Sequence, residues 1–257
     1  MNASKSELNV IFLAAGLGKR MGSSVEDRPK ALLPIQGKRS ILDISLANLA
    51  SVFPGSGSTI VAGYKRERVV EFIKDAPYPL RINMAINEKY DSTSPVKSIE
   101  EGIKQVPKLT HSLIIANGDT VFTEKVFKSL AGNIRHAGAA LLVSQEPHPD
   151  SDDIAVFIDK NANISAAKKS PDQQTGTISA GMLLLSGTQM IQTFTQCVYH
   201  LLDKERQFNK QYTWHALIGE MADRQLAVKP LYVERSAWQE FDTESNILAY
   251  QARVGLC

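Results

Sequence analysis

A glycine-rich turn with cationic side chains lies near the start of the chain. Val10–Ala15 is a short apolar run of the kind that forms a buried strand, and it leads directly into Gly16–Gly22, which holds three glycines and two cations. Glycines let a backbone turn tightly and approach a ligand, and the N–H groups of such a loop form a cradle for phosphate oxygens. A further cation, Lys30, follows Pro29 after a polar loop. This order of strand, glycine loop, Arg20 and Pro-Lys indicates a nucleoside triphosphate site.

Rival interpretations of this loop are weaker. The dinucleotide-binding pattern needs G-x-G-x-x-G, whereas the third glycine here comes one place late and two cations lie inside the loop. The P-loop pattern G-x-x-x-x-G-K-[ST] is absent from the sequence. An ordinary β-to-α turn with solvated cations remains an alternative, and the Pro29-Lys30 element argues against it.

Two elements of this region, residues 13–22 and Arg28–Leu32, together resemble the signature of the sugar-phosphate nucleotidylyltransferase superfamily. Within it, the chain is most similar to the choline-phosphate and phosphonate cytidylyltransferases, and the likeness spans nearly the whole chain. The resemblance implies an α/β protein: a three-layer α/β/α Rossmann-like nucleotidyltransferase fold with a mixed, mostly parallel sheet and a small β-hairpin lid. It also implies transfer from CTP to phosphocholine or 2-aminoethylphosphonate with release of pyrophosphate. A sugar-1-phosphate nucleotidylyltransferase that uses UTP, GTP or dTTP is the alternative.

Both reactants of such a transfer are anions, so the protein must neutralise charge and position the groups. Lys30 is expected to reach the α-phosphate and Arg20 the departing pyrophosphate. Base recognition is expected from Asn87 and the Ser92–Ser98 segment, where the related enzymes have a Thr-Asn-Asn-like sequence that this chain lacks. The expected nucleotide-binding residues are Leu13, Ala14, Ala15, Gly16, Gly18, Lys19, Asn87, Ser94, Ser98 and Gly118.

Two aspartates are the expected ligands of Mg²⁺, which prefers carboxylates and phosphate oxygens. Asp119 follows the apolar run Leu113–Ala116, and ligands of open α/β sheets sit at the carboxyl ends of strands. The related enzymes bind their metal with an aspartate in this Gly-Asp position and close their core with a motif that matches Asp242 here. Either aspartate could instead be a helix or turn cap, and Glu240 is a back-up ligand.

Acceptor recognition is assigned to the second half of the chain. The resemblance places a lysine after the expected hairpin, so that Lys169 or Lys168 contacts the acceptor phosphate; Lys169 is preferred as a catalytic residue. Ser179 and Gly181 resemble the small-residue turn beside the acceptor. Aromatic faces can hold a quaternary ammonium and an acid can hold a primary amine. The candidates for these roles are the aromatic residues Tyr199, Tyr212, Trp214 and above all Trp238, and the acids Asp152 and Asp153.

Composition limits the partners. The 257 residues have a formal net charge of +2 and no long apolar run, so binding of nucleic acid or insertion into a membrane is not expected. The polar N-terminus has no signal-peptide pattern, and the cysteines, Cys197 and Cys257, match no metal or redox spacing. We therefore expect free thiols and a cytoplasmic location. The expected partners are CTP, or another nucleoside triphosphate, and a small phosphate or phosphonate; the chain could form a homodimer.

Apolar runs alternate with helical patterns, which predicts a mostly parallel sheet covered by helices. Further strands are expected at Thr59–Ala62, Leu80–Ile86, Ala139–Ser144, Met182–Leu185 and Leu226–Val233, and a hairpin at Ile154–Ile158 and Ile164–Ala167. Helices are expected at Ile41–Val52, Arg68–Lys74, Pro95–Val106, Glu124–Arg135, Gln189–Leu202 and Tyr212–Asp223. We expect one domain, residues 1–257, with a nucleotide-binding half (about 9–144) and an acceptor-binding half (145–257). A catalytically silent nucleotide-binding protein would not need both Asp119 and Asp242.

Overall fold

The structure is a computed structural model that describes residues 8–108, 110–134, 136–146, 150–170 and 175–255. Its strands are β1 (Leu8–Ala14), β2 (Pro34–Gln36), β3 (Arg39–Ser40), β4 (Gly57–Ala62), β5 (Arg81–Ile86), β6 (Ser112–Asn117), β7 (Thr120–Phe122), β8 (Gly138–Gln145), β9 (Ile154–Ile158), β10 (Ile164–Lys169), β11 (Thr177–Ser186), β12 (Val228–Tyr232) and β13 (Trp238–Glu240). Its α-helices are α1 (Ile41–Val52), α2 (Arg66–Lys74), α3 (Pro95–Ile103), α4 (Glu124–Ala131), α5 (Thr188–Phe208), α6 (Ala216–Asp223) and α7 (Glu244–Arg253), and its 3₁₀ helices are η1 (Lys19–Val25), η2 (Lys30–Leu32) and η3 (Arg235–Ala237).

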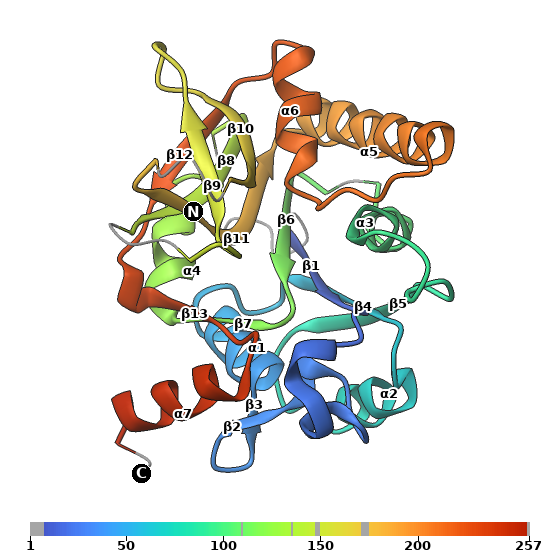
Figure 1. Cartoon of the computed structure of the whole chain (residues 1–257), viewed down its shortest axis with the longest axis vertical. Coiled ribbons are helices and arrows are strands. Elements are labelled where there is room, and N and C mark those ends of the chain that lie inside the picture. The colour runs from blue at the N-terminus through green and yellow to red at the C-terminus, as the bar shows by residue number, and fades with distance from the viewer. Residues whose placement is uncertain (1–7, 109, 135, 147–149, 171–174, 256–257) are drawn as a thin grey trace.

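A mixed central sheet runs through the molecule (Figure 1). Strands β5, β4, β1 and β6 are parallel neighbours, and β11 continues the sheet antiparallel to β6. Beyond β11, the sheet divides into the β9–β10 hairpin and the pair β8–β12. Because β1, β4 and β6 are parallel, their carboxyl ends meet at one edge of the sheet, where ligands of open α/β sheets bind. This edge carries the residues that follow Ala14 and Asn117.

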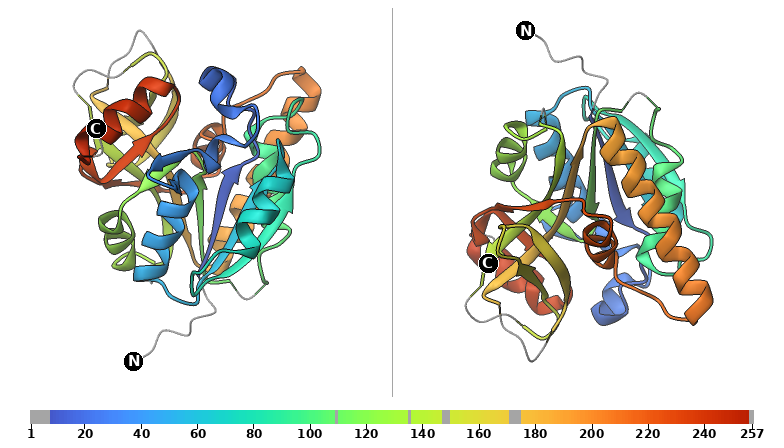
Figure 2. Two further views of the ribbon diagram at one scale, coloured as in Figure 1. Left: turned by 90° about the horizontal axis from the view of Figure 1, so that it is seen from below. Right: turned by 90° about the horizontal axis from the view of Figure 1, so that it is seen from above.

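Helices cover both faces of the sheet, as the two end-on views show (Figure 2). Side chains alternate between the faces along each strand. On β1, Ile11 belongs to an apolar cluster with side chains of α3, α5 and α6, whereas Phe12 belongs to one with side chains of α1, α2 and α4. The result is two apolar cores in a three-layer α/β/α arrangement, and the expected fold class is confirmed.

Several helices differ in length from their predicted ranges. The helix expected at Gln189–Leu202 extends over Thr188–Phe208, while the one expected at Tyr212–Asp223 begins only at Ala216. The preceding residues, Trp214 and His215, form a turn before the helix, with both side chains buried. The helix expected to end at Arg135 ends at Ala131, with Gly132 as its C-cap, and position 135 itself lies outside the described residues.

A small antiparallel pair, β7 with β13, was not expected from the sequence. Each strand has three residues, too few to produce a recognisable alternation. Thr120 lies opposite Glu240, and the Phe241 amide donates to the Asp119 carbonyl at 3.1 Å. This pairing brings Asp242 next to Asp119 from 123 positions away in the chain.

Among the described residues, every helix is too short or too polar to cross a bilayer.

Candidate functional site

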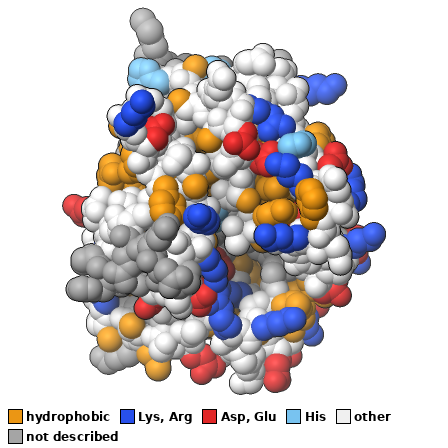
Figure 3. Space-filling view, turned by 45° about the horizontal axis from the view of Figure 1, so that its top comes forward, with side chains coloured by type: hydrophobic (Ala, Val, Ile, Leu, Met, Phe, Trp, Pro, Cys, Tyr) orange, Lys and Arg blue, Asp and Glu red, His pale blue; other side chains and the backbone are white. Residues whose placement is uncertain are grey.

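A cleft of about 480 Å³ opens at the edge of the sheet where the parallel strands end. One wall, here called the loop side, consists of the cleft residues between 13 and 20, Lys30 and the cleft residues between 87 and 98. The other wall, the hairpin side, consists of residues 152–154, Lys169 and the cleft residues between 179 and 215. Figure 3 shows a hollow on one face of the molecule with lysine and arginine side chains gathered beside it.

Two glycines permit the close packing of the loop side. Gly18 has a positive φ of 63°, and a Cβ there would lie 3.2 Å from the Cβ of Lys30. Gly118 donates its amide to the Leu13 carbonyl, and a Cβ there would lie only 2.6 Å from that oxygen. Both positions therefore have to remain glycine for the loop, Lys30 and the end of β6 to meet.

Lys30 is the central cation of the cleft. Its side chain is only 10% exposed, and its Nζ lies 2.8 Å from Asp119 Oδ2 and 2.6 Å from Asp242 Oδ1. Burial lowers the pKa of the Lys30 ammonium, but the two carboxylates outweigh this effect and raise the pKa above its ordinary value. Lys30 is therefore a permanently charged donor, held by one residue from β6–β7 and one from the segment after β13.

A second ionic group bridges the two walls at the mouth of the cleft. Arg20 donates to Asp152 at 2.5 Å and lies 3.0 Å from Asp242. Lys169 donates to the other oxygen of Asp152, also at 2.5 Å. The hydrogen bond from Lys169, together with the nearby Arg20, holds the pKa of the Asp152 carboxyl below its usual range. All three side chains are about half exposed, so the bridge is accessible to a competing anion.

Asn87 organises the start of α3 rather than standing free in the cleft. Its Nδ2 donates to Thr93 and Ser98, and its Oδ1 accepts the Lys89 amide. Ser94 caps α3 by accepting the Val96 amide and donates its own proton to Glu205 on α5. Asn87, Ser94 and Ser98 all line the cleft, in the order expected from the sequence.

Four further cleft residues form a hydrogen-bonded group that the sequence analysis did not assemble. Trp214 Nε1 donates to Asn117 Oδ1 at 2.9 Å, and His215 Nε2 lies 2.9 Å from Ser179 Oγ. Complete burial lowers the pKa of His215 to about 3, so the imidazole is neutral at ordinary pH. Of these four, only Ser179 was assigned a role and Trp214 was one of several aromatic candidates. The signal available for Asn117 was its place two residues before Asp119.

Most of the predicted site residues meet in this cleft. Those that line it are Leu13, Ala14, Ala15, Gly16, Gly18, Lys19, Arg20, Lys30, Asn87, Ser94, Ser98, Gly118, Asp119, Asp153, Lys169, Ser179, Gly181 and Asp242.

Four predicted acceptor candidates lie outside the cleft: Trp238, Lys168, Tyr199 and Tyr212. Trp238 is 2% exposed, packs in the core beside α4, and has the Arg235 guanidinium 4.3 Å above its ring. Its placement four residues before Asp242 suggested proximity, but an extended chain separates such residues by about 13 Å. Lys168 lies over the Phe157 ring at 5.2 Å, because neighbouring residues of β10 point to opposite faces. Of the two lysines, Lys169 alone faces the cleft.

Comparison with known proteins identifies the family. The family model described as the MobA-like NTP transferase domain matches residues 10–236. The chain belongs to this family. It therefore contains a nucleotidyltransferase domain, and the resemblance seen in the sequence is confirmed at that level.

Curated relatives of this MobA-like NTP transferase domain differ in what their names describe. The bifunctional protein GlmU of Methanocaldococcus jannaschii is 23% identical over 229 residues, which are 88% of this chain and 47% of that protein. The CMP-5'-(3-aminopropyl)phosphonate synthase of Streptomyces rubellomurinus is 32% identical over 124 residues, 48% of this chain and 19% of that protein. The chain thus spans about half or less of the length of these relatives.

Solved structures share the whole fold. The inositol-1-phosphate CTP transferase of T. maritima superposes with a TM-score of 0.76 at 15% identity, covering 99% of this chain and 98% of the other. The CTP:phosphocholine cytidylyltransferase of Streptococcus pneumoniae gives 0.71 at 13% identity, covering 97% and 99%. At these identities the likeness demonstrates a common fold.

Nucleotidyltransferases of this family typically use a divalent metal, and the cleft contains side chains that suit one. Carboxylate oxygens of Asp119, Glu240 and Asp242 all lie within 4.8 Å of one another. Burial and the negative charges of Asp119 and Asp242 raise the pKa of Glu240 to about 8. Three oxygen ligands converging at the end of a parallel strand fit Mg²⁺, which keeps its remaining positions for water and phosphate.

Proposed function

We propose that the protein transfers a cytidylyl group from CTP to a small phosphonate or phosphate that carries a primary amine, such as 2-aminoethylphosphonate. Pyrophosphate is the second product. The observation that carries the proposal is the position of Lys30, a buried cation between Asp119 and Asp242 at the end of a glycine loop. A buried cation between two acids suits a reaction in which anionic groups must come together.

The reaction is an in-line displacement. An oxygen of the acceptor attacks the α-phosphorus, a new P–O bond forms, and the bond to the pyrophosphate oxygen breaks. In this proposal Lys30 donates to the α-phosphate, where charge accumulates in the transition state. Arg20 lies on the loop side at the mouth of the cleft and holds the departing pyrophosphate. The loop from Leu13 to Lys19 supplies backbone donors to the remaining phosphate oxygens.

Asp119 and Asp242 would hold Mg²⁺, with Glu240 as a third carboxylate beside them. Bound there, the ion supplies positive charge that offsets the repulsion between the two anionic reactants. Lys30 is shared by the same two aspartates, so its ammonium stays aimed at the point where the reactants meet.

CTP is favoured over other nucleotides by two considerations. The segment that starts α3 offers the hydroxyl groups of Thr93 and Ser98. Asn87 holds both hydroxyls in place by donating hydrogen bonds to them. Hydroxyls can donate to or accept from the edge of a pyrimidine. Relatives in sequence and structure include proteins whose names describe CTP or CMP chemistry.

An amine-bearing acceptor is favoured by the acids of the hairpin side. Asp152 is paired with Arg20 and Lys169, whereas no ion pair to Asp153 is formed by the described side chains. The Trp214 ring is buried and stacked on His215 at 3.8 Å, so it does not offer the open aromatic face that a quaternary ammonium requires. A primary ammonium is therefore the better partner than trimethylammonium, and Lys169 supports the acceptor's phosphorus group.

Transfer to a sugar 1-phosphate is the second candidate. It is favoured by the neutral hydrogen-bonding side chains of the cleft, Asn117 and Ser179, which could bind sugar hydroxyls. The relatives also include a D-glycero-α-D-manno-heptose 1-phosphate guanylyltransferase of Aneurinibacillus thermoaerophilus, 25% identical over 178 residues.

The test is pyrophosphate release with Mg²⁺ across CTP, UTP, GTP, ATP and dTTP. Each nucleotide is paired with 2-aminoethylphosphonate, phosphocholine, glycerol phosphate and several sugar 1-phosphates. The proposal expects the highest kcat/KM for CTP with 2-aminoethylphosphonate. A higher kcat/KM with any sugar 1-phosphate would overturn the proposed acceptor. A higher kcat/KM with another nucleotide would overturn the proposed use of CTP.

A further inference from the structure

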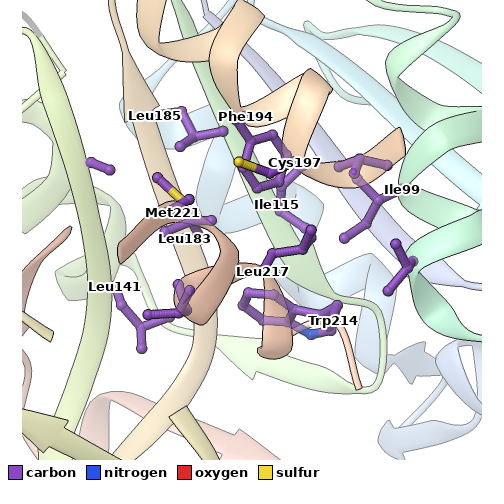
Figure 4. Close-up of a cluster of buried hydrophobic side chains, with 14 of the residues drawn as sticks. Ile99, Ile115, Leu141, Leu183, Leu185, Phe194, Cys197, Trp214, Leu217 and Met221 are labelled. Carbon is purple, nitrogen blue, oxygen red and sulfur yellow. The ribbon is translucent and has the colours of Figure 1, made fainter. Parts of the chain in front are cut away.

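Two adjacent aromatic rings before α6 each reach a side chain on the central sheet. Trp214 and His215 are stacked with ring centroids 3.8 Å apart and planes inclined by 25°. Trp214 donates to Asn117 at the end of β6, and His215 Nε2 lies within hydrogen-bond distance of Ser179 on β11. Figure 4 shows Trp214 at the border of the apolar cluster that contains Leu217 and Ile115. Both rings are thus buried, and all four residues are among those that line the cleft.

The contact with Trp214 determines how the Asn117 amide is oriented. An indole N–H can only donate, so the atom of Asn117 that faces it must be the carbonyl oxygen. The Asn117 Nδ2 group, with its two N–H donors, therefore points away from Trp214. It lies beside Gly181, where a Cβ would come within 2.7 Å of Nδ2. The absence of a side chain at position 181 leaves room for the amide group at this point of the cleft.

Ser179 is held in a corresponding way. Its Oγ accepts the Gly181 amide at 3.1 Å, and the second contact is with His215 Nε2 at 2.9 Å. His215 is 4% exposed and neutral, so only one of its ring nitrogens carries a proton. When that proton is on Nε2, Ser179 accepts two hydrogen bonds and its own hydroxyl proton is free to donate.

We propose that Trp214 and His215 are positioning residues that aim two neutral donors, the Asn117 amide and the Ser179 hydroxyl, at the tetrahedral oxyanion of the acceptor. The inference rests on the proposed nucleotidyl transfer and deepens it. In this arrangement Lys169 supplies charge from the hairpin, and the neutral donors fix the direction of the phosphonate or phosphate. His215 carries the Nε2–H tautomer.

The chemistry of the attacking group gives a reason for neutral donors. The acceptor oxygen is the nucleophile, so its electron density must remain available for the α-phosphorus. A cation on every acceptor oxygen would hold the anion tightly in the ground state without a matching gain in the transition state. Neutral hydrogen bonds orient the group while they withdraw less charge from it. The cations Lys30 and Arg20 remain on the side of the cleft assigned to the triphosphate.

The experiment compares the constants for acceptor and nucleotide in four variants. Ser179→Ala removes one donor, Trp214→Phe releases the Asn117 amide, and His215→Leu removes the donor to Ser179. His215→Gln is the conservative variant, because a glutamine amide can still donate to Ser179. Ser186→Ala is the matched control: Ser186 is also buried on β11, but at the opposite end of the strand and outside the cleft.

The readouts are KM for the acceptor, KM for the nucleotide, and the inhibition constant of methylphosphonate, which has the tetrahedral oxyanion and nothing else that the acceptor side could recognise. We expect Ser179→Ala, Trp214→Phe and His215→Leu to raise the acceptor KM and the methylphosphonate constant about tenfold, with the nucleotide KM within twofold of wild type. His215→Gln and Ser186→Ala should stay within twofold on all three measures. Thermal melting establishes that each variant is folded.

Unchanged acceptor constants in Trp214→Phe and Ser179→Ala would overturn the inference, as would an equal rise in the nucleotide KM. Should His215→Leu not fold, Ser179→Ala and Trp214→Phe still decide the matter. Failure of the proposed function appears differently: wild-type protein would then turn over a sugar 1-phosphate in preference to 2-aminoethylphosphonate. The same ratios of constants, measured with that acceptor, still test the positioning pair.

Discussion

The loop side and the hairpin side of the cleft are built by different means. The loop side comes largely from one continuous stretch, in which β1, the glycine turn, Arg20 and Lys30 follow one another within residues 8–30. The hairpin side gathers single residues from β9, β10, β11 and the turn before α6. The loop side presents backbone donors and buried charge, whereas the hairpin side combines exposed ion pairs with neutral hydrogen bonds. Proteins of one fold can thus keep the same reaction centre on the loop side while the hairpin side is adapted to different acceptors.

The largest expected effect on the reaction rate comes from replacing two aspartates of the cleft, Asp119 and Asp242. Asp119→Ala and Asp242→Ala should each lower kcat on the order of a thousandfold or more, because each removes a proposed metal ligand worth several kcal/mol in the transition state. Steady-state rates at saturating Mg²⁺ provide the measurement. Asp75→Ala, at an exposed residue after α2, is the control. A variant that keeps more than about a tenth of the wild-type kcat has lost under about 1.4 kcal/mol, and its residue would be dropped as a ligand.

The two cations of the loop side, Lys30 and Arg20, should affect different kinetic constants. Lys30→Ala is expected to lower kcat about a hundredfold, because in the proposed mechanism Lys30 stabilises charge that develops at the α-phosphate. Arg20→Ala should mainly raise the nucleotide KM, since the triphosphate is already charged in the ground state. Full kinetic constants for both variants distinguish these effects. The opposite pattern would mean that the two roles are exchanged.

His215 should leave a signature in the pH dependence of stability. Its pKa is about 3 in the folded protein and about 6.5 in an unfolded chain, so the unfolded state binds more protons between these values. The free energy of unfolding is therefore intact above pH 6.5 and falls as the pH decreases toward 3, by about 2 kcal/mol at pH 5. Urea unfolding at pH 7 and pH 5 measures the loss. His215→Gln should lose about 2 kcal/mol less than wild type over this interval, and identical losses would contradict complete burial of a neutral imidazole.

The lysine pair of β10 provides a comparison within one strand. Lys169 faces the cleft and Lys168 lies over Phe157. Lys169→Ala is expected to raise the acceptor KM about tenfold, equivalent to about 1.4 kcal/mol, while Lys168→Ala should leave it unchanged. Acceptor titrations at saturating nucleotide test this difference. Equal effects of the two substitutions would mean that the face of β10 on which a lysine lies does not determine whether it contacts the acceptor.

The same contrast explains what could be predicted from the sequence. The loop side is contiguous, so spacing alone brought Gly18, Arg20 and Lys30 together, and the end of β6 followed from the parallel sheet. The hairpin side depends on contacts between distant segments. His215 could not be assigned because the turn that carries it was predicted as helix, and Asn117 because its partner is 97 residues away. Trp238 was misjudged because distance along a strand is much greater than distance along a helix of the same number of residues.

The most direct test of the account is a competition for one nucleotide. Wild-type protein receives CTP and Mg²⁺ with 2-aminoethylphosphonate, phosphocholine and glucose 1-phosphate at equal concentrations, and the products are identified by mass. The account predicts that the CMP conjugate of 2-aminoethylphosphonate dominates, because Asp153 suits a primary ammonium. A dominant nucleotide sugar would contradict the acceptor assignment, and the absence of any CMP conjugate would contradict cytidylyl transfer itself.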